Sequence, residues 1–316
     1  MIIEWTWWEQ AASEREWGKM FGAIHRVDDE PQPAQLAPAV EALANGMIVA
    51  LPSPDGFMLC ANGDNPDAVM NLKRLPGASP TSICVTSKAM FNRVFPKQGP
   101  AIERVRDVLL ELGVSVRLPH ARFDQGLRVC MANDAMAARV IEQAGVPVMC
   151  RTALDNKGAM LASPSQVARR WPGRVEIILD AGRENDELQA RPDAVMMRGG
   201  VAIKGMKAEA HAEAVERFRR SVVFVCLGNL NRSAFSEVLL NAIAQDEARQ
   251  AETKGFSYLP AYAPQSAGVI AVSGAKAPET MIAAAARFDC RGLMEAHEAR
   301  LFTRELAGEN VEIVPL

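Results

Sequence analysis

Short apolar runs recur along the first two-thirds of the chain, and helical patterns separate several of them. Runs such as MIVALP and VEIILD have the length and composition of buried strands. Residues 134–143 have a helical pattern that Gly145 ends. Four other apolar residues are spaced to share one face of a helix, namely Ile102, Val105, Leu109 and Leu112. Strands that alternate with helices predict an α/β fold, and we expect a mixed sheet because several runs have no helix between them.

The pattern changes after Lys204, where a polar stretch rich in Ala and Glu runs to Ser221. It predicts an exposed helix that is either a linker between two domains or an ordinary surface helix. The next residues, VVFVC, have a buried-strand pattern, and a short polar loop and a long helical stretch from Ala234 follow them. A strand, a tight loop and a helix begin a parallel α/β unit. We therefore expect the 316-residue chain to hold two domains.

Composition narrows the class of protein. With 49% hydrophobic and 23% charged residues the chain is typical of globular proteins, which excludes a disordered one. The net charge is −3, and neither half is basic, which argues against a broad nucleic-acid surface. Six cysteines are scattered without a CxxC pair, which predicts a reducing, cytoplasmic compartment and no metal site. No apolar run approaches the roughly 20 residues of a membrane span.

The N-terminus is unusually rich in tryptophan. Four of the five tryptophans lie in the first 17 residues, at positions Trp5, Trp7, Trp8 and Trp17. This segment lacks the basic start and the long apolar core of a signal peptide. Amphipathic aromatic side chains here predict anchors for an interface or, alternatively, packing on their own domain.

The segment VCLGNLNRS carries the strongest chemical signal. Cys226 and Arg232 lie six positions apart between the predicted strand and helix, and Ser233 follows. Backbone N–H groups of such a loop can surround a phosphate, and the same field lowers the pKa of a cysteine. We predict that Cys226 is a nucleophile, that Arg232 binds phosphoryl oxygens and that Ser233 donates to the thiolate. The loop between them comprises Leu227, Gly228, Asn229, Leu230 and Asn231. The alternative is a strand-end cysteine beside an unrelated surface arginine.

The stretch VFVCLGNLNRSAFSEVLL resembles the active-site segment of low-molecular-weight protein tyrosine phosphatases. Further on, SAG at 266–268, Gly274 and HEARLFTREL, which contains His297, resemble the same family in the same order. The resemblance implies a cofactor-free phosphatase with Cys226 as nucleophile and Asn229 as a loop-stabilising residue. His297 is then either part of the supporting hydrogen bonds or an ordinary structural histidine.

One departure from that family concerns the general acid. The resemblance implies an aspartate in an Asp-Pro turn, but this dipeptide does not occur after Cys226. The matching stretch, residues 221–316, is also shorter than the family's domain. Loss of the acid predicts a rate lower by roughly 10²–10⁴-fold, and phosphate binding without catalysis is the alternative. We expect the shortened sheet to be covered by the first domain or by a second copy of the chain.

The stretch from Ala42 to Val85 resembles the opening of the YrdC-like family, and LRVCMAND, VPVMCRTALDNKG, VEIILDAGR and VMMRGG fit its later segments. Members make threonylcarbamoyl-adenylate from threonine, bicarbonate and ATP for tRNA modification. The resemblance implies ATP, with or without Mg, as cofactor if this domain is active. It points to five candidate binding residues, Ser53, Lys73, Arg74, Arg128 and Thr152.

The YrdC-like stretch also departs from its family's pattern. Leu75 stands where a second basic residue belongs, and Leu154 stands where the family has an asparagine. We expect a surviving fold with reduced synthesis. The predicted segments are an N-terminal extension (1–34), a mixed-sheet YrdC-like domain (35–204), a helical linker (205–220) and a truncated phosphatase-like domain with a parallel, Rossmann-like sheet (221–316). The expected partners are a phosphate-bearing ligand or phosphoprotein and a nucleotide. The functions left open are phosphatase, phosphate-binding scaffold or sensor, and threonylcarbamoyl-adenylate synthase.

Overall fold

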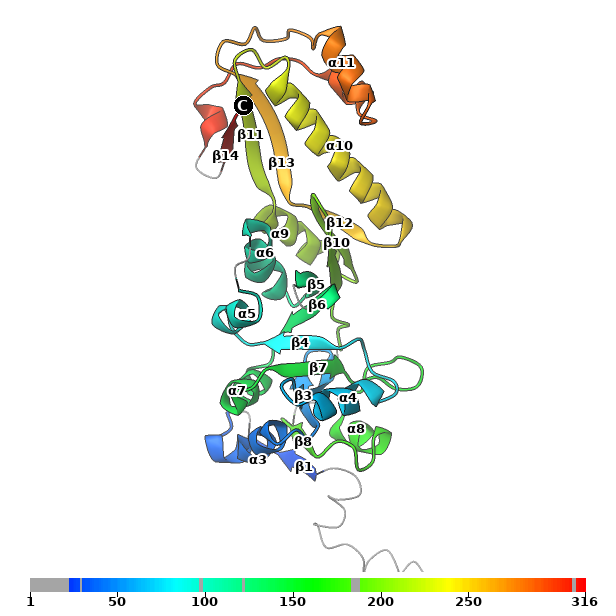
Figure 1. Cartoon of the computed structure of the whole chain (residues 1–316). Helices are drawn as coiled ribbons and strands as arrows, with labels where there is room; N and C mark the ends of the chain where they lie inside the picture. The colour runs from blue at the N-terminus through cyan, green and yellow to red at the C-terminus, as the bar shows by residue number, and fades with distance from the viewer. Residues whose placement is uncertain (1–22, 29, 97–98, 121–122, 183–187, 309–310) are drawn as a thin grey trace, which may run out of the picture. The chain divides into compact units, whose positions relative to one another are not determined.

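The computed structural model describes residues 23–28, 30–96, 99–120, 123–182, 188–308 and 311–316 (Figure 1). The tryptophan cluster lies outside these residues. The chain divides into two compact units, which we call the first unit (Met1–Gly99 and Gly113–Arg191) and the second unit (Pro100–Leu112 and Pro192–Leu316). Among the described residues, no helix combines the length and the apolar character needed to cross a membrane.

The first unit is built on a mixed sheet, as predicted. Its strands are ordered β1-β8-β2-β3-β7-β4-β6-β5. Their bounds are Ala23–Arg26 (β1), Val49–Ser53 (β2), Gly56–Asn62 (β3), Ser82–Val85 (β4), Ser115–His120 (β5), Phe123–Met131 (β6), Val148–Thr152 (β7) and Ile177–Asp180 (β8). β2 pairs parallel with β8 and antiparallel with β3, and β4 pairs parallel with β6 and antiparallel with β7.

In the described part of the first unit, five helices accompany this sheet: α3 (Pro33–Ala44), α4 (Pro66–Arg74), α5 (Lys88–Val94), α7 (Ala135–Ala144) and α8 (Pro164–Arg170). The side chain of Asp134 caps α7 by accepting from two backbone N–H groups, and Gly145 ends it in the left-handed conformation. This confirms the helix expected over 134–143. α3 and α7 contribute to one apolar core, and α4 and α8 contribute to another that contains the buried Trp171.

The N-terminal extension differs from the prediction. Residues 23–26, assigned to a segment outside the domain core, form β1, which pairs parallel with β8 from Ala23↔Ile177 to Arg26↔Asp180. The four side chains of β1 alternate between half-buried and exposed, as expected of a strand with one face open to solvent. This part of the extension therefore belongs to the sheet, and α3 begins at Pro33, two residues before the predicted start of the domain at residue 35.

The second unit contains three antiparallel strands, β9 (Asp193–Met196), β10 (Gly200–Lys204) and β12 (Ser257–Pro260), with β10 in the middle. The domain boundary predicted at Lys204 therefore falls inside this unit. A contact from further along the chain also places the turn between β9 and β10 in this unit. The buried carboxylate of Glu247, in the helix Arg232–Thr253, accepts from the backbone N–H groups of Arg198 and Gly199 at 2.7 and 2.9 Å. The predicted linker 205–220 is largely helix α9 (Ala208–Phe218), whose Phe218 is fully buried.

Residues 100–112, expected as one amphipathic helix, also lie in the second unit. The backbone is helical over most of this range, as α6 (Pro100–Arg104) and a π-helical turn η1 (Val105–Leu110). The buried face differs from the expected one: Val105 and Leu109 are buried, whereas Ile102 and Leu112 are half-exposed. The wider winding of the π-helical turn accounts for this difference, because it changes which side chains share a face.

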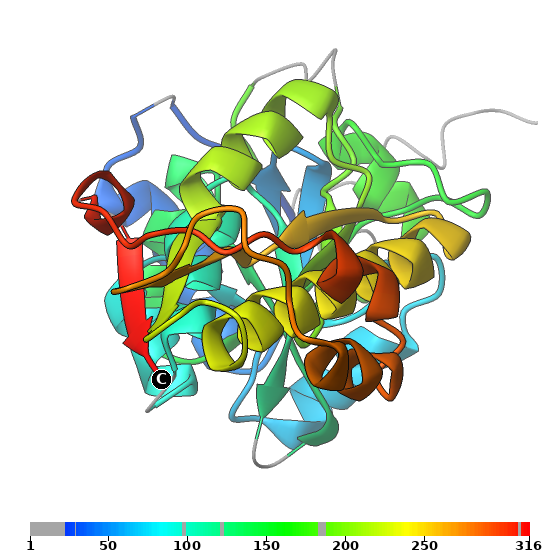
Figure 2. The same cartoon turned by 90° about the horizontal axis from the view of Figure 1, so that it is seen from above.

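Three further strands of the second unit pair in parallel, in the order β13-β11-β14. They are β11 (Arg220–Cys226), β13 (Tyr262–Gly268) and β14 (Val311–Pro315). The 22-residue helix α10 (Arg232–Thr253) follows β11 and contacts β13. Helices α11 (Glu279–Ala286) and α12 (Arg291–Ala296), orange in Figure 2, lie beside the yellow α10. The loop between β11 and α10 is the segment that the sequence singled out.

Candidate functional site

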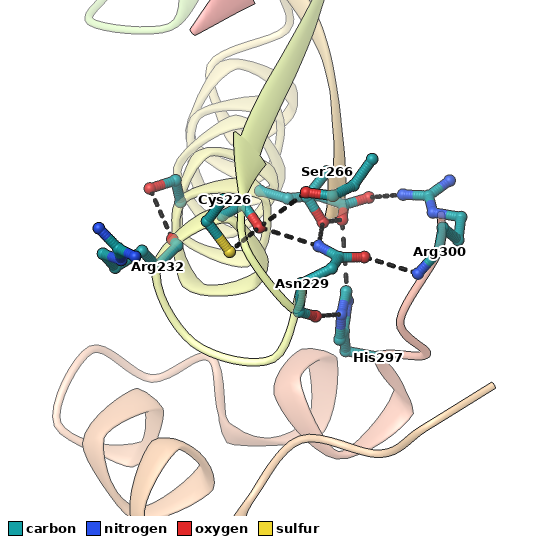
Figure 3. Close-up of polar contacts among 10 residues, drawn as sticks. Cys226, Asn229, Arg232, Ser266, His297 and Arg300 are labelled. Atoms are coloured by element: carbon teal, nitrogen blue, oxygen red, sulfur yellow. Dashed lines mark hydrogen bonds and ion pairs between the residues drawn. The ribbon is translucent and has the colours of Figure 1, made fainter. Parts of the chain in front are cut away.

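Cys226 is the last residue of β11, and its side chain faces the first turn of α10. Its Sγ lies 2.9 Å from the hydroxyl oxygen of Ser233 (Figure 3). Both residues are buried, with Cys226 8% exposed. The strand supplies the thiol and the helix supplies the hydroxyl, so the two predicted residues meet where strand and helix join.

Asn229 holds the loop from the inside. Its backbone has a φ of 54°, a left-handed conformation that asparagine adopts more readily than most residues. Its amide nitrogen donates to the hydroxyls of Ser233 at 3.0 Å and Ser266 at 2.7 Å, and its amide oxygen accepts from the backbone N–H of Arg300 at 2.7 Å. The fully buried side chain therefore links the loop to α10, to β13 and to the segment after His297.

A second layer of contacts surrounds Asn229. The carboxylate of Glu237 accepts from the Ser266 hydroxyl and, at 2.8 Å, from the Arg300 guanidinium. His297 Nε2 lies 2.9 Å from the backbone oxygen of Asn229, and its Nδ1 lies 3.8 Å from Glu237. His297 thus belongs to the supporting contacts. Sequence reasoning missed Glu237 and Arg300, although Glu237 follows Ser233 by four residues and so shares its helix face.

Gly268 allows β13 to approach the loop closely. A Cβ atom on this residue would lie 2.7 Å from both the backbone nitrogen of Asn229 and the carbonyl oxygen of Leu227. These are backbone atoms, which cannot turn aside as a flexible side chain can. The SAG stretch therefore contributes a hydroxyl at Ser266, a carbonyl at Ala267 that lies 3.3 Å from the Ser233 hydroxyl, and free space at Gly268.

The surroundings of Cys226 favour its thiolate. Burial raises the pKa of the thiol, but hydrogen bonds from the Ser233 hydroxyl and from the backbone N–H groups of Ser233, Asn229 and Gly228 act in the opposite direction. The net effect is a pKa below the ordinary value of cysteine. These donors are the groups that the loop would also present to a phosphate.

Arg232 and Asn231 are exposed at the start of α10, and Leu227 is 57% exposed. The Arg232 side chain points away from Asn229, Ser266 and His297 in Figure 3. Among the described residues, no hydrogen bond or ion pair holds its guanidinium. The side chain is therefore available to an anion, but it must rotate over the loop to bind one.

In the first unit, Ser53 and Thr152 meet at a carboxylate that the sequence did not indicate. The buried Asp55 accepts from the Ser53 hydroxyl and, at 2.6 Å, from the Thr152 hydroxyl. The guanidinium of Arg191 lies 3.5 Å from Asp55 and also donates to Ser53 at 3.2 Å and to the carbonyl of Met131 at 2.8 Å. Ser53 also lines a cavity of about 280 Å³.

The predicted residues Lys73 and Arg74 are exposed in the last turn of α4, and Arg128 is half-buried on β6 opposite Arg117. Within the described chain, no hydrogen bond or ion pair connects these three residues to Asp55. The end of α4 is instead held by Arg151 of β7. Its guanidinium donates at 2.5–3.0 Å to five backbone carbonyls, those of Leu72, Lys73, Leu75, Ala78 and Ser79.

No protein-family model matches the sequence, and no curated protein matches it. Among solved structures, Sua5 of P. abyssi complexed with L-threonine is 15% identical, covering 93% of this chain and 92% of its own, with a TM-score of 0.52. YciO of E. coli is 15% identical, covering 59% of this chain and 96% of its own, with a TM-score of 0.50. The chain therefore shares the mixed α/β fold of Sua5 and YciO.

A low-molecular-weight protein tyrosine phosphatase of T. tengcongensis is 22% identical over 30% of this chain and 57% of its own, with a TM-score of 0.23. The chain thus spans little more than half the length of that phosphatase, and the overall likeness carries no argument. The case for phosphate chemistry depends on the contacts around Cys226.

Proposed function

We propose that the second unit binds a phosphate monoester at residues 226–233 and hydrolyses it through a phosphocysteine at Cys226. The observation that supports this most directly is the chain of hydrogen bonds from Cys226 to Ser233 and on to Asn229, at 2.9 and 3.0 Å. It stabilises a thiolate within a loop whose backbone N–H groups are directed at negative charge. The resemblance of residues 221–316 to part of a tyrosine phosphatase domain agrees with this assignment.

The reaction has two steps. In the first, the Cys226 thiolate attacks phosphorus, an S–P bond forms, and the P–O bond to the leaving group breaks with both electrons going to oxygen. In the second, a water oxygen attacks phosphorus and the S–P bond breaks. Inorganic phosphate is released and the Cys226 thiolate is regenerated, while a proton of the water passes to solvent. Arg232, once rotated over the loop, would bind two phosphoryl oxygens and stabilise the charge that they carry.

Departure of the leaving group determines the substrate range. No Asp-Pro turn occurs between Cys226 and Leu316, and the carboxylate of Glu237 accepts hydrogen bonds from Ser266 and Arg300. With these residues alone, we expect the leaving oxygen to depart as an anion or to take its proton from solvent. We expect activated aryl phosphates to be cleaved much faster than unactivated esters.

The test compares 2,4-dinitrophenyl, 4-nitrophenyl and phenyl phosphate as substrates of the full chain. We expect the rate to fall steeply as the leaving phenol becomes more basic, and Cys226→Ser to abolish turnover. The matched control is Ser236→Ala, because that hydroxyl donates to the Arg232 carbonyl and not to Cys226. Mass spectrometry of rapidly quenched protein should detect phosphocysteine. A folded chain with an intact thiol that cleaves none of the three esters would refute catalysis.

A phosphate-binding protein without catalysis is the second candidate, favoured by the outward-pointing Arg232 and the lack of an acid. It predicts that phosphate or vanadate slows alkylation of Cys226 although no ester is hydrolysed. Under this reading the ligand is a phosphoprotein or another phosphate-bearing molecule. If phosphate protects Cys226 from alkylation and the esters are also hydrolysed, the protein is an enzyme.

For the first unit we propose a YrdC-like, nucleotide-binding fold with reduced threonylcarbamoyl-adenylate synthesis. The hydroxyls of Ser53 and Thr152 donate to Asp55, so neither is free to donate to a substrate without breaking that bond. Pyrophosphate release that requires ATP with Mg²⁺, threonine and bicarbonate together would show that the domain retains synthase activity. We expect a slow release that is detectable only at high protein concentration, and no release under that condition, with ATP still bound, would refute synthesis.

A further inference from the structure

Four cysteines lie in a row on one face of the first unit's sheet. They come from consecutive strands, Cys60 from β3, Cys150 from β7, Cys84 from β4 and Cys130 from β6. Cys60 is directly opposite Cys150, and Cys84 is directly opposite Cys130. All four are buried in one core. They are far apart in sequence and brought together only by the strand order.

Three of these thiols converge on a point. The Sγ atoms of Cys84, Cys130 and Cys150 all lie within 4.8 Å of one another, and those of Cys130 and Cys150 are 3.4 Å apart. A metal ion about 2.3 Å from each of three thiolates places the sulfur atoms about 3.8–4.0 Å from one another. The three sulfurs therefore reach the spacing of a metal site if each separation changes by about 1 Å or less.

A largely buried cation lies beside this cluster. The guanidinium of Arg191 is close enough to Cys84, Cys130 and Cys150 to interact with them electrostatically, and its other charged partner is Asp55. Three thiolates around a divalent ion carry one net negative charge, and around a monovalent ion they carry two. A neighbouring guanidinium lowers the cost of burying either arrangement.

A disulfide does not fit the closest pair. Cys130 and Cys150 belong to β6 and β7, which are separated by β4. Two strand spacings put their backbones about 9–10 Å apart, whereas a disulfide requires Cα atoms within about 7 Å. Their sulfurs meet because both side chains reach across the intervening strand. A bridging ion suits this geometry.

We propose that Cys84, Cys130 and Cys150 together bind one thiophilic d10 metal ion, Zn²⁺ or Cu(I), in the core of the first unit. Thiolate ligands select these soft ions over the hard cations that bind carboxylates. The site is independent of the loop at Cys226, and it replaces the expectation that the chain has no metal ligands. In the alternative, the three thiols are small apolar residues that fill the core.

The experiment titrates the full-length, metal-free protein under reducing conditions. Every protein carries Cys226→Ser, which removes the one thiolate in the loop as a competing ligand. Cd²⁺ serves as a spectroscopic probe because thiolate-to-cadmium charge transfer absorbs in the ultraviolet. We expect a band that saturates at one ion per chain, and a rise in melting temperature on metal addition. Competition against chromophoric chelators with Zn²⁺ and with Cu(I) then identifies the preferred ion.

Single substitutions locate the site. Cys84→Ala, Cys130→Ala and Cys150→Ala should each weaken binding by about tenfold or more, because loss of a ligand exceeds the effect of losing an outer partner. Cys60→Ala, in the same row, and Cys290→Ala, in the second unit, are matched controls that should keep the band. If the folded parent shows no band, or if the band survives each of the three substitutions, the proposal is wrong. The absence of a band in the folded parent would refute the proposal even if none of the three cluster variants folded.

Discussion

The imidazole Nε2 of His297 lies 2.9 Å from the backbone oxygen of Asn229, the residue in left-handed conformation at the centre of the loop. A carbonyl only accepts hydrogen bonds, so Nε2 carries the hydrogen. The other ring nitrogen faces Glu237 at 3.8 Å. The ring thus spans from a carboxylate on α10 to the loop backbone and holds the loop in the conformation described above.

His297→Leu should loosen the loop without touching a group that contacts phosphate. It leaves the buried Asn229 carbonyl without its donor, at a cost of about 1–3 kcal/mol. We expect phosphate to protect Cys226 from alkylation about tenfold less well. The control is Glu298→Gln, an exposed neighbour whose side chain pairs with Lys276. Equal protection in both variants would show that His297 does not position the loop.

Alkylation of Cys226 by iodoacetamide should report its lowered pKa. The rate rises with pH as the thiolate forms, so in the native protein half of the maximal rate should be reached below the ordinary cysteine value. Ser233→Ala removes a donor to the thiolate, which should move this midpoint to higher pH. Ser236→Ala should leave it unchanged, and Cys226→Ser gives the background rate. A midpoint that does not move in Ser233→Ala would contradict the assigned contact.

Arg151→Met should destabilise the first unit strongly. The variant removes five hydrogen bonds from a charged donor and leaves carbonyls at the end of α4 without partners. We expect an unfolding free energy lower by about 3 kcal/mol or more, measured by urea denaturation. Arg174→Met, at an exposed arginine, should change it by less than about 0.5 kcal/mol. Similar unfolding midpoints for the two variants would show that Arg151 does not stabilise the end of α4.

Asp55→Asn should also be destabilising, for a different reason. It leaves the largely buried guanidinium of Arg191 without the buried Asp55 carboxylate, and breaking a buried pair costs about 3–5 kcal/mol. Asp64→Asn, at an exposed position, is the control. If Asp55→Asn is as stable as the control, the hydrogen bonds of Ser53 and Thr152 to Asp55 do not stabilise the fold. The two hydroxyls would then be available to donate to a substrate.

The loop at Cys226 could be predicted because its strand, turn and helix are contiguous, and the groups that we propose to contact phosphate all lie within eight residues. The contacts of Asp55 with Thr152 and of Cys130 with Cys150 could not, since they depend on strand order across the mixed sheet. The boundary at Lys204 was misplaced for a related reason. The polar segment after it is a helix of the second unit, and the pairing of β10 with β12 has no local signature.

Gly268 has an evolutionary consequence. Replacement by alanine, a change of one methyl group, would force β13 and the loop apart and so disturb every donor that faces Cys226, although all functional side chains remain. A lineage could therefore lose anion binding in one step and keep the rest of the domain. The residue at position 268 is thus a simple marker for sorting homologous sequences into those that retain this site and those that have discarded it.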